Sequence, residues 1–280
     1  MKRRTTVVLG VAVVLSLAAV YGVNRLAAGG EVTEVGVDEA LDRYREQTAT
    51  TSLMPAESAP TSASDATTAA ASSVPAALAA LPAPGVYQYA TSGFDRIDAL
   101  TGAQHDYPAI TTMTVTPEGC GVRVRWDVAV ERWDTWDWCL DGAAIRQNGW
   151  VGYHEFFDSP GRNDYLCDGD PRPLDALART TWTMVCRMGD HTTSTFRGEV
   201  IERTSLMVAG IATPVLHVRY EVEVVGESTG HQTVEGWYRI ADGLPVREQL
   251  AISTTQDTVI GATRFDEQYT LDLHTPSPTS

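Results

Sequence analysis

The chain contains almost no lysine: Lys2 is the single lysine among its 21 basic residues. It also carries 36 acidic residues, which give a net charge of −15 at pH 7. A surface this acidic repels phosphate backbones, so we expect no nucleic-acid partner. The preference for arginine over lysine is typical of a GC-rich bacterial genome.

Catalytic and cofactor motifs are also missing. The sequence has no G-x-S-x-G elbow, no phosphate-binding or dinucleotide glycine loop and no H-E-x-x-H helix. We therefore predict no catalytic residues, no cofactor and no enzyme activity. One alternative is a hydrolase or metal site between His154 and Asp170. Its candidate residues match neither a zinc helix nor a calcium loop, which favours scattered polar loop residues and predicts no metal site: His154, Glu155, Asp158, Asp164, Asp168 and Asp170.

No two cysteines have the spacing of a metal ligand pair. The chain holds four: Cys120, Cys139, Cys167 and Cys186. An even number in an exported chain indicates disulfides, and three connectivities are possible. Two equal intervals favour Cys120–Cys139 and Cys167–Cys186, and four buried free thiols are the alternative.

The N-terminal segment has the pattern of a membrane anchor. Lys2, Arg3 and Arg4 precede twenty uncharged residues, 5–24, which are long enough to span a bilayer as a helix. The basic cluster predicts a cytoplasmic N-terminus and an extracytoplasmic remainder. A signal peptide cleaved after Leu26-Ala27-Ala28 is the alternative, which Arg25 and the length of the apolar run disfavour.

Composition divides the chain into five parts. We expect a cytoplasmic stub and transmembrane anchor over 1–30, and a short juxtamembrane helix over 31–47 that acts as a spacer or docks on another surface. Residues 48–84 are rich in Ser, Thr, Ala and Pro and predict a disordered linker. An extracytoplasmic β domain follows over 85–274, and 275–280 is expected to be a disordered tail.

The β domain shows alternating apolar and polar residues with little helical periodicity. Leu216, Val218, Tyr220, Val222 and Val224 predict a strand with one buried face, after a hairpin at Val208-Ala209-Gly210-Ile211. The same pattern continues to a final strand with Phe265, Tyr269, Leu271 and Leu273 on one face. The fold class is therefore all-β, an antiparallel meander in a strongly curved sheet, half-barrel or sandwich. Residues 149–167 mix aromatic and polar residues, so we expect an irregular, exposed segment there.

The stretch between Cys120 and Cys139 predicts two paired strands, but it leaves open which face of the sheet the tryptophans of the second strand occupy. Val122, Val124 and Trp126 share one face, and Trp136 and Trp138 share one on the returning arm. A tight hairpin with the cysteines directly opposite would turn Trp136 and Trp138 outward. A β-bulge near 132–134 would turn them inward.

Aromatic residues cluster in and after this stretch. Trp133, Trp136, Trp138, Trp150 and Tyr153 are the candidate ligand-binding residues. The alternative is that the tryptophans only cover one end of the sheet.

Several segments resemble those of uncharacterised membrane-anchored actinobacterial proteins with an extracytoplasmic β domain. They are VDEALDRYR, GVYQYATSGFDRIDAL, WDWC, YHEFFD, DYLC, TTWTMVC and WYRIADGLPVREQL. This resemblance implies no activity. The strands and the turn at Asp242-Gly243 are loosely similar to the curved sheets of periplasmic lipoprotein carriers, although those have a lipid anchor and no disulfides.

We therefore expect a module on the outer side of the cell membrane that binds a lipid or other hydrophobic or amphipathic ligand without catalysis. The alternatives are a protein-interaction or structural module with an envelope protein as partner, and the hydrolase noted above. A cavity in the sheet favours the first, and an exposed aromatic patch the second.

Overall fold

The computed structural model describes residues 32–52, 80–99, 102–258 and 261–280. The predicted anchor and most of the predicted linker lie outside these residues. Among the described residues, no helix is long and apolar enough to cross a membrane. The elements are helix α2 (Val37–Ser52) and strands β1 (Gly85–Ile97), β2 (Ala103–Asp106), β3 (Ile110–Glu118), β4 (Gly121–Ala129), β5 (Arg132–Asp141), β6 (Ala144–Phe156), β7 (Ser159–Gly169), β8 (Arg172–Pro173), β9 (Thr181–Met188), β10 (Thr192–Val208), β11 (Ile211–Gly226), β12 (Ser228–Arg239), β13 (Pro245–Thr258) and β14 (Gly261–Leu273).

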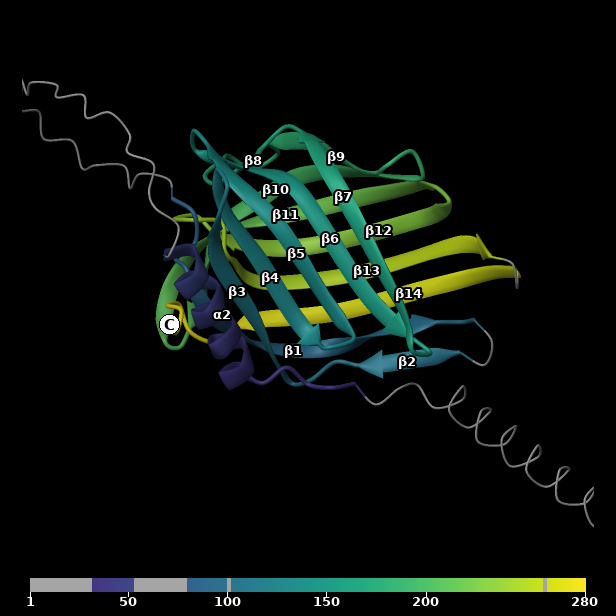
Figure 1. Ribbon diagram of the computed structural model, residues 1–280. Coiled ribbons are helices and arrows are strands. Elements are labelled where there is room, and N and C mark those ends of the chain that lie inside the picture. Colours follow the sequence, from purple (N-terminus) through teal and green to yellow (C-terminus); the bar gives the residue numbers. More distant parts are fainter. Residues whose placement is uncertain (1–31, 53–79, 100–101, 259–260) are drawn as a thin grey trace, which may run out of the picture.

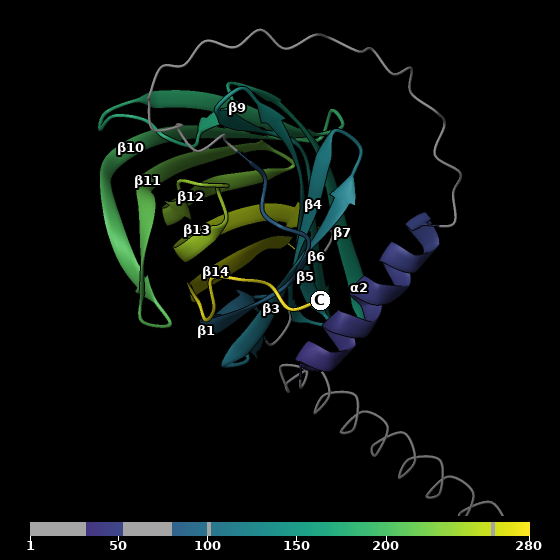
Figure 2. The ribbon, with the colours of Figure 1, turned by 90° about the vertical axis from the view of Figure 1, so that its left-hand side faces the viewer.

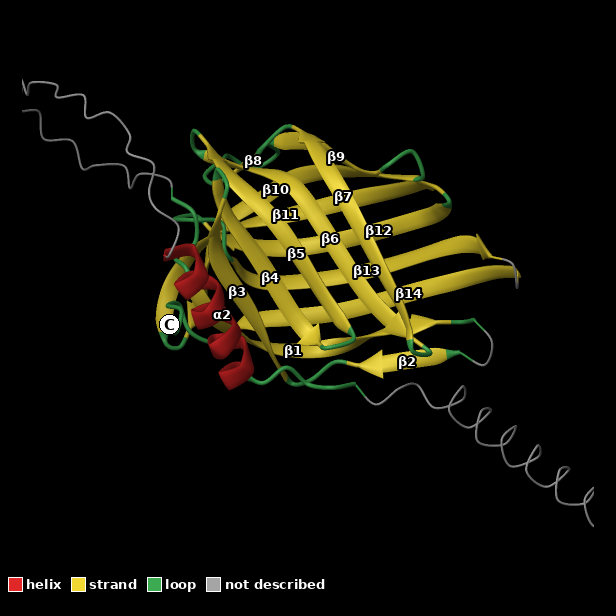
Figure 3. Ribbon diagram, in the orientation of Figure 1, coloured by secondary structure: helices red, strands yellow, loops and turns green. Residues whose placement is uncertain are grey.

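The strands form an antiparallel barrel, which confirms the all-β prediction (Figures 1 and 3). Successive strands pair from β3 to β7 and from β9 to β14, and β7 pairs with β9. The pairing of β1 with both β3 and β14 closes a ring of 12 strands. The expected curved sheet is therefore a full barrel, since its first and last strands meet.

Two walls of the barrel face each other. In Figure 2, β4 to β7 form one wall and β10 to β14 the other. Tight turns connect their strands, and the predicted hairpin at Val208–Ile211 is confirmed: Ala209 and Gly210 have φ of 48° and 81°, the left-handed values of a hairpin turn. A packed core inside the barrel includes Tyr87, Leu244 and Leu273.

Residues 149–167 are regular, so the prediction of an irregular segment is wrong. They form most of the hairpin of β6 and β7, which turns at Phe157 and Asp158 with φ of 57° and 56°. Strand β7 is polar and mostly exposed along its length. It therefore lacks the alternation by which a strand is recognised from sequence.

Helix α2 packs against the outside of the barrel (Figure 2). Ala40 and Leu41 contact Val86, and Arg43 Nη1 donates to both carboxylate oxygens of Asp127 at 2.9 Å. The helix ends at Ser52, beyond the expected boundary at residue 47. The helix was expected to act as a spacer or to dock on another surface, and in the structure it docks on the barrel.

The C-terminal residues pair with β1, which differs from the expected disordered tail over 275–280. Thr279 N donates to Val86 O at 2.9 Å, and Val86 N donates to Thr279 O at 2.8 Å. Arg239 Nη1 also donates to Pro276 O at 2.6 Å. These long-range backbone bonds satisfy polar groups of the tail, which its Ser- and Pro-rich composition does not reveal.

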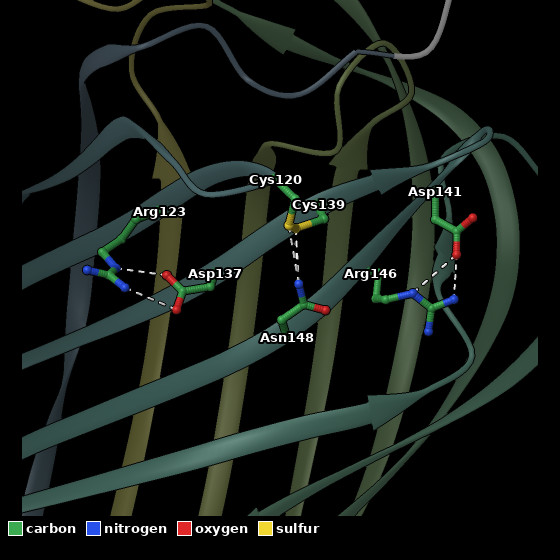
Figure 4. The surroundings of a disulfide bond; sticks show 7 residues. All are labelled: Cys120, Arg123, Asp137, Cys139, Asp141, Arg146 and Asn148. Carbon is green, nitrogen blue, oxygen red and sulfur yellow. Dashed lines mark hydrogen bonds and ion pairs between the residues drawn. A yellow bond between two sulfur atoms is a disulfide. The ribbon is translucent and has the colours of Figure 1, made fainter. Parts of the chain in front are cut away.

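Both predicted disulfides are present, Cys120–Cys139 and Cys167–Cys186. Figure 4 shows the first on the outer face, where Asn148 Nδ2 lies 3.0 Å from Cys139 Sγ. Asn148 is the extra residue of a bulge in β6, between the pairs Asp137–Gly149 and Trp138–Gln147. The neighbouring Arg123–Asp137 and Arg146–Asp141 pairs share this face.

Candidate ligand-binding cavity

The barrel encloses a cavity of about 560 Å³ between its two walls. Alternate residues of β5, β6, β12, β13 and β14 point into it, as the pleat of a strand requires. Exposed residues at the β6–β7 turn and near the end of β13 line it too, so it reaches the surface there: Ser159, Pro160, Gly161 and Gln256. Its apolar and aromatic lining residues include Trp136, Trp138, Trp150, Phe156, Tyr165, Trp182, Phe196, Tyr220, Tyr238, Leu250, Phe265 and Tyr269.

The structure divides the five predicted ligand-binding residues into two groups. Trp136, Trp138 and Trp150 line the cavity. Trp133 and Tyr153 lie on the outer face, where their rings stack with centroids 5.0 Å apart. The Arg125 guanidinium lies 4.1 Å from the Trp133 ring and covers part of it. This pair is therefore not part of the cavity.

A β-bulge at Val128 turns Trp136 and Trp138 inward. The hairpin begins with Ala129 opposite Arg132, and the next pair is Asp127 with Trp133, so Val128 is the extra residue. Trp136 then lies opposite Val124, and Trp138 opposite Val122. The bulge lies on β4 rather than at residues 132–134, but it turns both tryptophans inward, as the bulge alternative required.

The inward face of β5 also carries two buried charges, Arg132 and Asp134, of which Arg132 was not predicted from the sequence. Arg132 Nη2 donates to Asp134 at 2.6 Å and to Glu267 of β14 at 2.8 Å. The hydroxyl of Tyr107 donates to the same Glu267 oxygen. Glu267 lies between Phe265 and Tyr269 on the same face of β14. A carboxylate on this otherwise apolar face was the signal in the sequence that could have predicted a buried polar site.

A second carboxylate lies on the inward face of β13. Glu248 accepts hydrogen bonds from Tyr238 at 2.8 Å and from Tyr269 at 2.7 Å. Burial raises the pKa of Glu248, and it raises the pKa of both tyrosines as well. Glu248 therefore holds a proton more readily than an exposed glutamate.

Arg172 of β8 is the other guanidinium of the lining. Its side chain is 8% exposed, and its guanidinium carbon lies 4.0 Å from the centroid of the Tyr238 ring. Its Nη2 donates to Gly243 O at 3.1 Å. Gly243 has φ of +75°, and an added Cβ would lie 2.3 Å from Ile145, so glycine is required for this close approach.

His154 points into the barrel and contacts Asp95 of β1, not the carboxylates of its own segment. Its Nδ1 lies 3.0 Å from Asp95 Oδ2 of β1, and His105 Nδ1 lies 3.0 Å from Oδ1 without hydrogen-bond geometry. Burial acts to raise the pKa of Asp95, but the contacts with the two histidines and the charge of Arg132 outweigh it and hold the pKa well below its usual range.

The carboxylates of the His154–Asp170 segment do not gather around His154. Glu155 accepts from Tyr153, Asp164 pairs with Arg162, and Asp170 accepts from Thr183 N. Within the ranges that the structure describes, no three His, Cys, Asp or Glu side chains form a group that could hold a metal. The convergence that the hydrolase hypothesis requires is therefore not found in this segment.

No protein-family model matches this chain, and no curated protein matches it. Among solved structures, a Bacteroides fragilis protein of YmcC-like fold, provisionally described as exported, is 9% identical over 71% of this chain and 98% of that chain. The TM-score is 0.28, so the likeness carries no argument here.

Proposed function

We propose that this β domain binds an amphipathic ligand in its cavity, without catalysis, as a module of the cell envelope. The cavity carries the proposal. Its volume of about 560 Å³ lies in the range of about 300–1,000 Å³ that is typical of small-molecule sites. Aromatic walls with a few fixed polar groups are the usual lining of such sites.

The lining supports an amphipathic ligand rather than a purely apolar one. Trp136, Trp150 and Leu250 offer apolar contact along the walls. Arg132 and Glu248 are held in place by hydrogen bonds and leave polar groups at the cavity wall. A ligand that fits this lining has an apolar body and a polar group.

The position outside the membrane is the second part of the proposal. Two disulfides tie the barrel, and disulfides persist in oxidising compartments. The charge pattern of residues 1–30 supports an anchor with a cytoplasmic N-terminus. The partners in this proposal are a membrane and an envelope ligand. It includes no nucleic acid.

Cavity binding is tested by filling the cavity. The full chain, held in nanodiscs to accommodate the expected anchor, is titrated with the apolar fluorophore N-phenyl-1-naphthylamine, with empty nanodiscs as the blank. Leu250 lines the cavity and its neighbour Ala251 points outward. We expect Leu250→Trp to weaken binding about tenfold or more, equivalent to about 1.4 kcal/mol.

The matched variant Ala251→Trp adds the same ring outside the barrel and is expected to bind the fluorophore as the unmodified chain does. Absence of binding by the unmodified chain would refute the proposal. Equal binding by the unmodified chain and both variants would place the fluorophore elsewhere and would also refute it.

A further inference from the structure

Arg172 lies at the inner part of the cavity, away from the opening at the β6–β7 turn. Its backbone pairs with Ile145 near the start of β6, whereas the opening lies at the other end of that strand. Tyr238 and Trp138 flank its guanidinium at 4.0 Å and 5.8 Å. A ligand that extends from the opening into the barrel therefore reaches Arg172 with its leading end.

This guanidinium has no carboxylate partner among the residues that the structure describes. Its Nη2 donates to Gly243 O, and its Nη1 has no hydrogen-bond partner. Asp170, two residues earlier, accepts from Thr183 N instead. Arg132, at 3% exposed, also has an Nη1 without a hydrogen-bond partner, but unlike Arg172 it has two carboxylates within 2.8 Å.

An unpaired buried charge is costly, because it loses hydration without a compensating anion. The Tyr238 ring offsets part of this cost through its π-face. Glu248 also contacts Tyr238, but its carboxylate accepts from the hydroxyls of Tyr238 and Tyr269 and forms no ion pair with Arg172 among the described residues. The free N–H groups of Arg172 are suited to an acceptor that bears negative charge.

We infer that the ligand is an amphipathic anion whose acidic head, a carboxylate or a phosphate, binds Arg172 while its apolar body lies along the aromatic walls. This inference rests on the proposed cavity binding. The net charge of −15 opposes the approach of an anion, so the inference assigns the preference for an anion to Arg172 inside the barrel rather than to the charge of the whole chain.

The test compares three ligands with the same chain, decanoate, decyl phosphate and the neutral decanol. Each is titrated calorimetrically into the full chain in nanodiscs, with empty nanodiscs as the blank. We expect at least one anion to bind more tightly than decanol, and the tighter anion identifies the head group. Arg172→Met is expected to weaken that anion by about 10- to 100-fold while leaving decanol unchanged.

Two variants separate recognition from folding. Arg172→Lys keeps the charge and is expected to retain most of the preference. Arg197→Met removes an exposed arginine on the outer face of β10 and is expected to change nothing. If Arg172 serves the ligand, Arg172→Met without ligand is expected to melt at the same temperature or higher, because an unpaired buried charge is gone.

Anions that bind no more tightly than decanol would overturn the inference and leave cavity binding intact. A lower melting temperature of Arg172→Met with unchanged anion binding would assign Arg172 a structural role and would also overturn it. If decanol fails to bind as well, the proposed function itself is refuted.

Discussion

Asp95 illustrates how single residues of the interior are kept charged. It is fully buried, and its carboxylate lies between His105 and His154. Because those contacts hold its folded pKa below the unfolded value of about 3.9, the charged form stabilises the fold. That contribution is complete above about pH 5 and is lost as the pH falls through and below 4.

Replacing Asp95 with Asn is expected to remove both the contribution and its pH dependence. At pH 7 we expect Asp95→Asn to lower the free energy of unfolding by about 1–3 kcal/mol, because the two histidines lose an ionic partner. Between pH 5 and pH 3 the difference from the unmodified chain should shrink. Chemical denaturation at each pH measures this.

Asp164→Asn is a control for that experiment, since Asp164 pairs with Arg162 on the exposed surface and contributes little. A difference for Asp95→Asn that stays constant from pH 7 to pH 3 would contradict the stabilising charge.

At the scale of elements, the weakest junction of the barrel lies between β7 and β9. Only four residue pairs join them, at 166–169 and 184–187, whereas eight join β7 to β6 and eight join β9 to β10. The Cys167–Cys186 disulfide lies within these four pairs. The Cys120–Cys139 disulfide instead joins β5 to the residue before β4, and eight pairs already hold these strands.

Removal of the two disulfides should therefore have different local effects. Both span 19 residues, so the loop-entropy model predicts a similar loss of about 3 kcal/mol for each. We expect Cys167→Ser with Cys186→Ser also to accelerate amide hydrogen exchange in β7 and β9, as measured by mass spectrometry. Cys120→Ser with Cys139→Ser is the matched variant, and equal exchange in β7 and β9 for both pairs would refute a weak junction.

At the scale of the whole molecule, local patterns predicted the strands but not how the ring closes. Alternation identified the buried face of β11 and the inward face of β14, and equal cysteine spacing identified both disulfides. The pairing of β1 with β14 joins residues more than 160 positions apart, and no local pattern encodes it. The sequence therefore predicted a curved sheet, whereas the structure has a barrel.

The candidate site was predicted in part for the same reason. Trp136, Trp138 and Trp150 line the cavity, but the parity of the two β5 tryptophans depended on a bulge at Val128 that apolar valine does not signal. Arg172 follows the polar strand β7 and belongs to a strand of two residues, so no periodicity marked it as buried. Its surroundings depend on Tyr238 and Gly243, which only the closed barrel brings to it.

The location of a bound amphipathic anion tests the central claim most directly. Crystals of the full chain grown with 10-bromodecanoate, whose bromine lies at the end opposite the carboxylate, would locate that end by anomalous scattering. The account predicts bromine inside the barrel, between the β6–β7 turn and the inner aromatic residues, with the carboxylate at Arg172. Bromine only on the outer surface, beside Trp133 and Tyr153 for example, would contradict it.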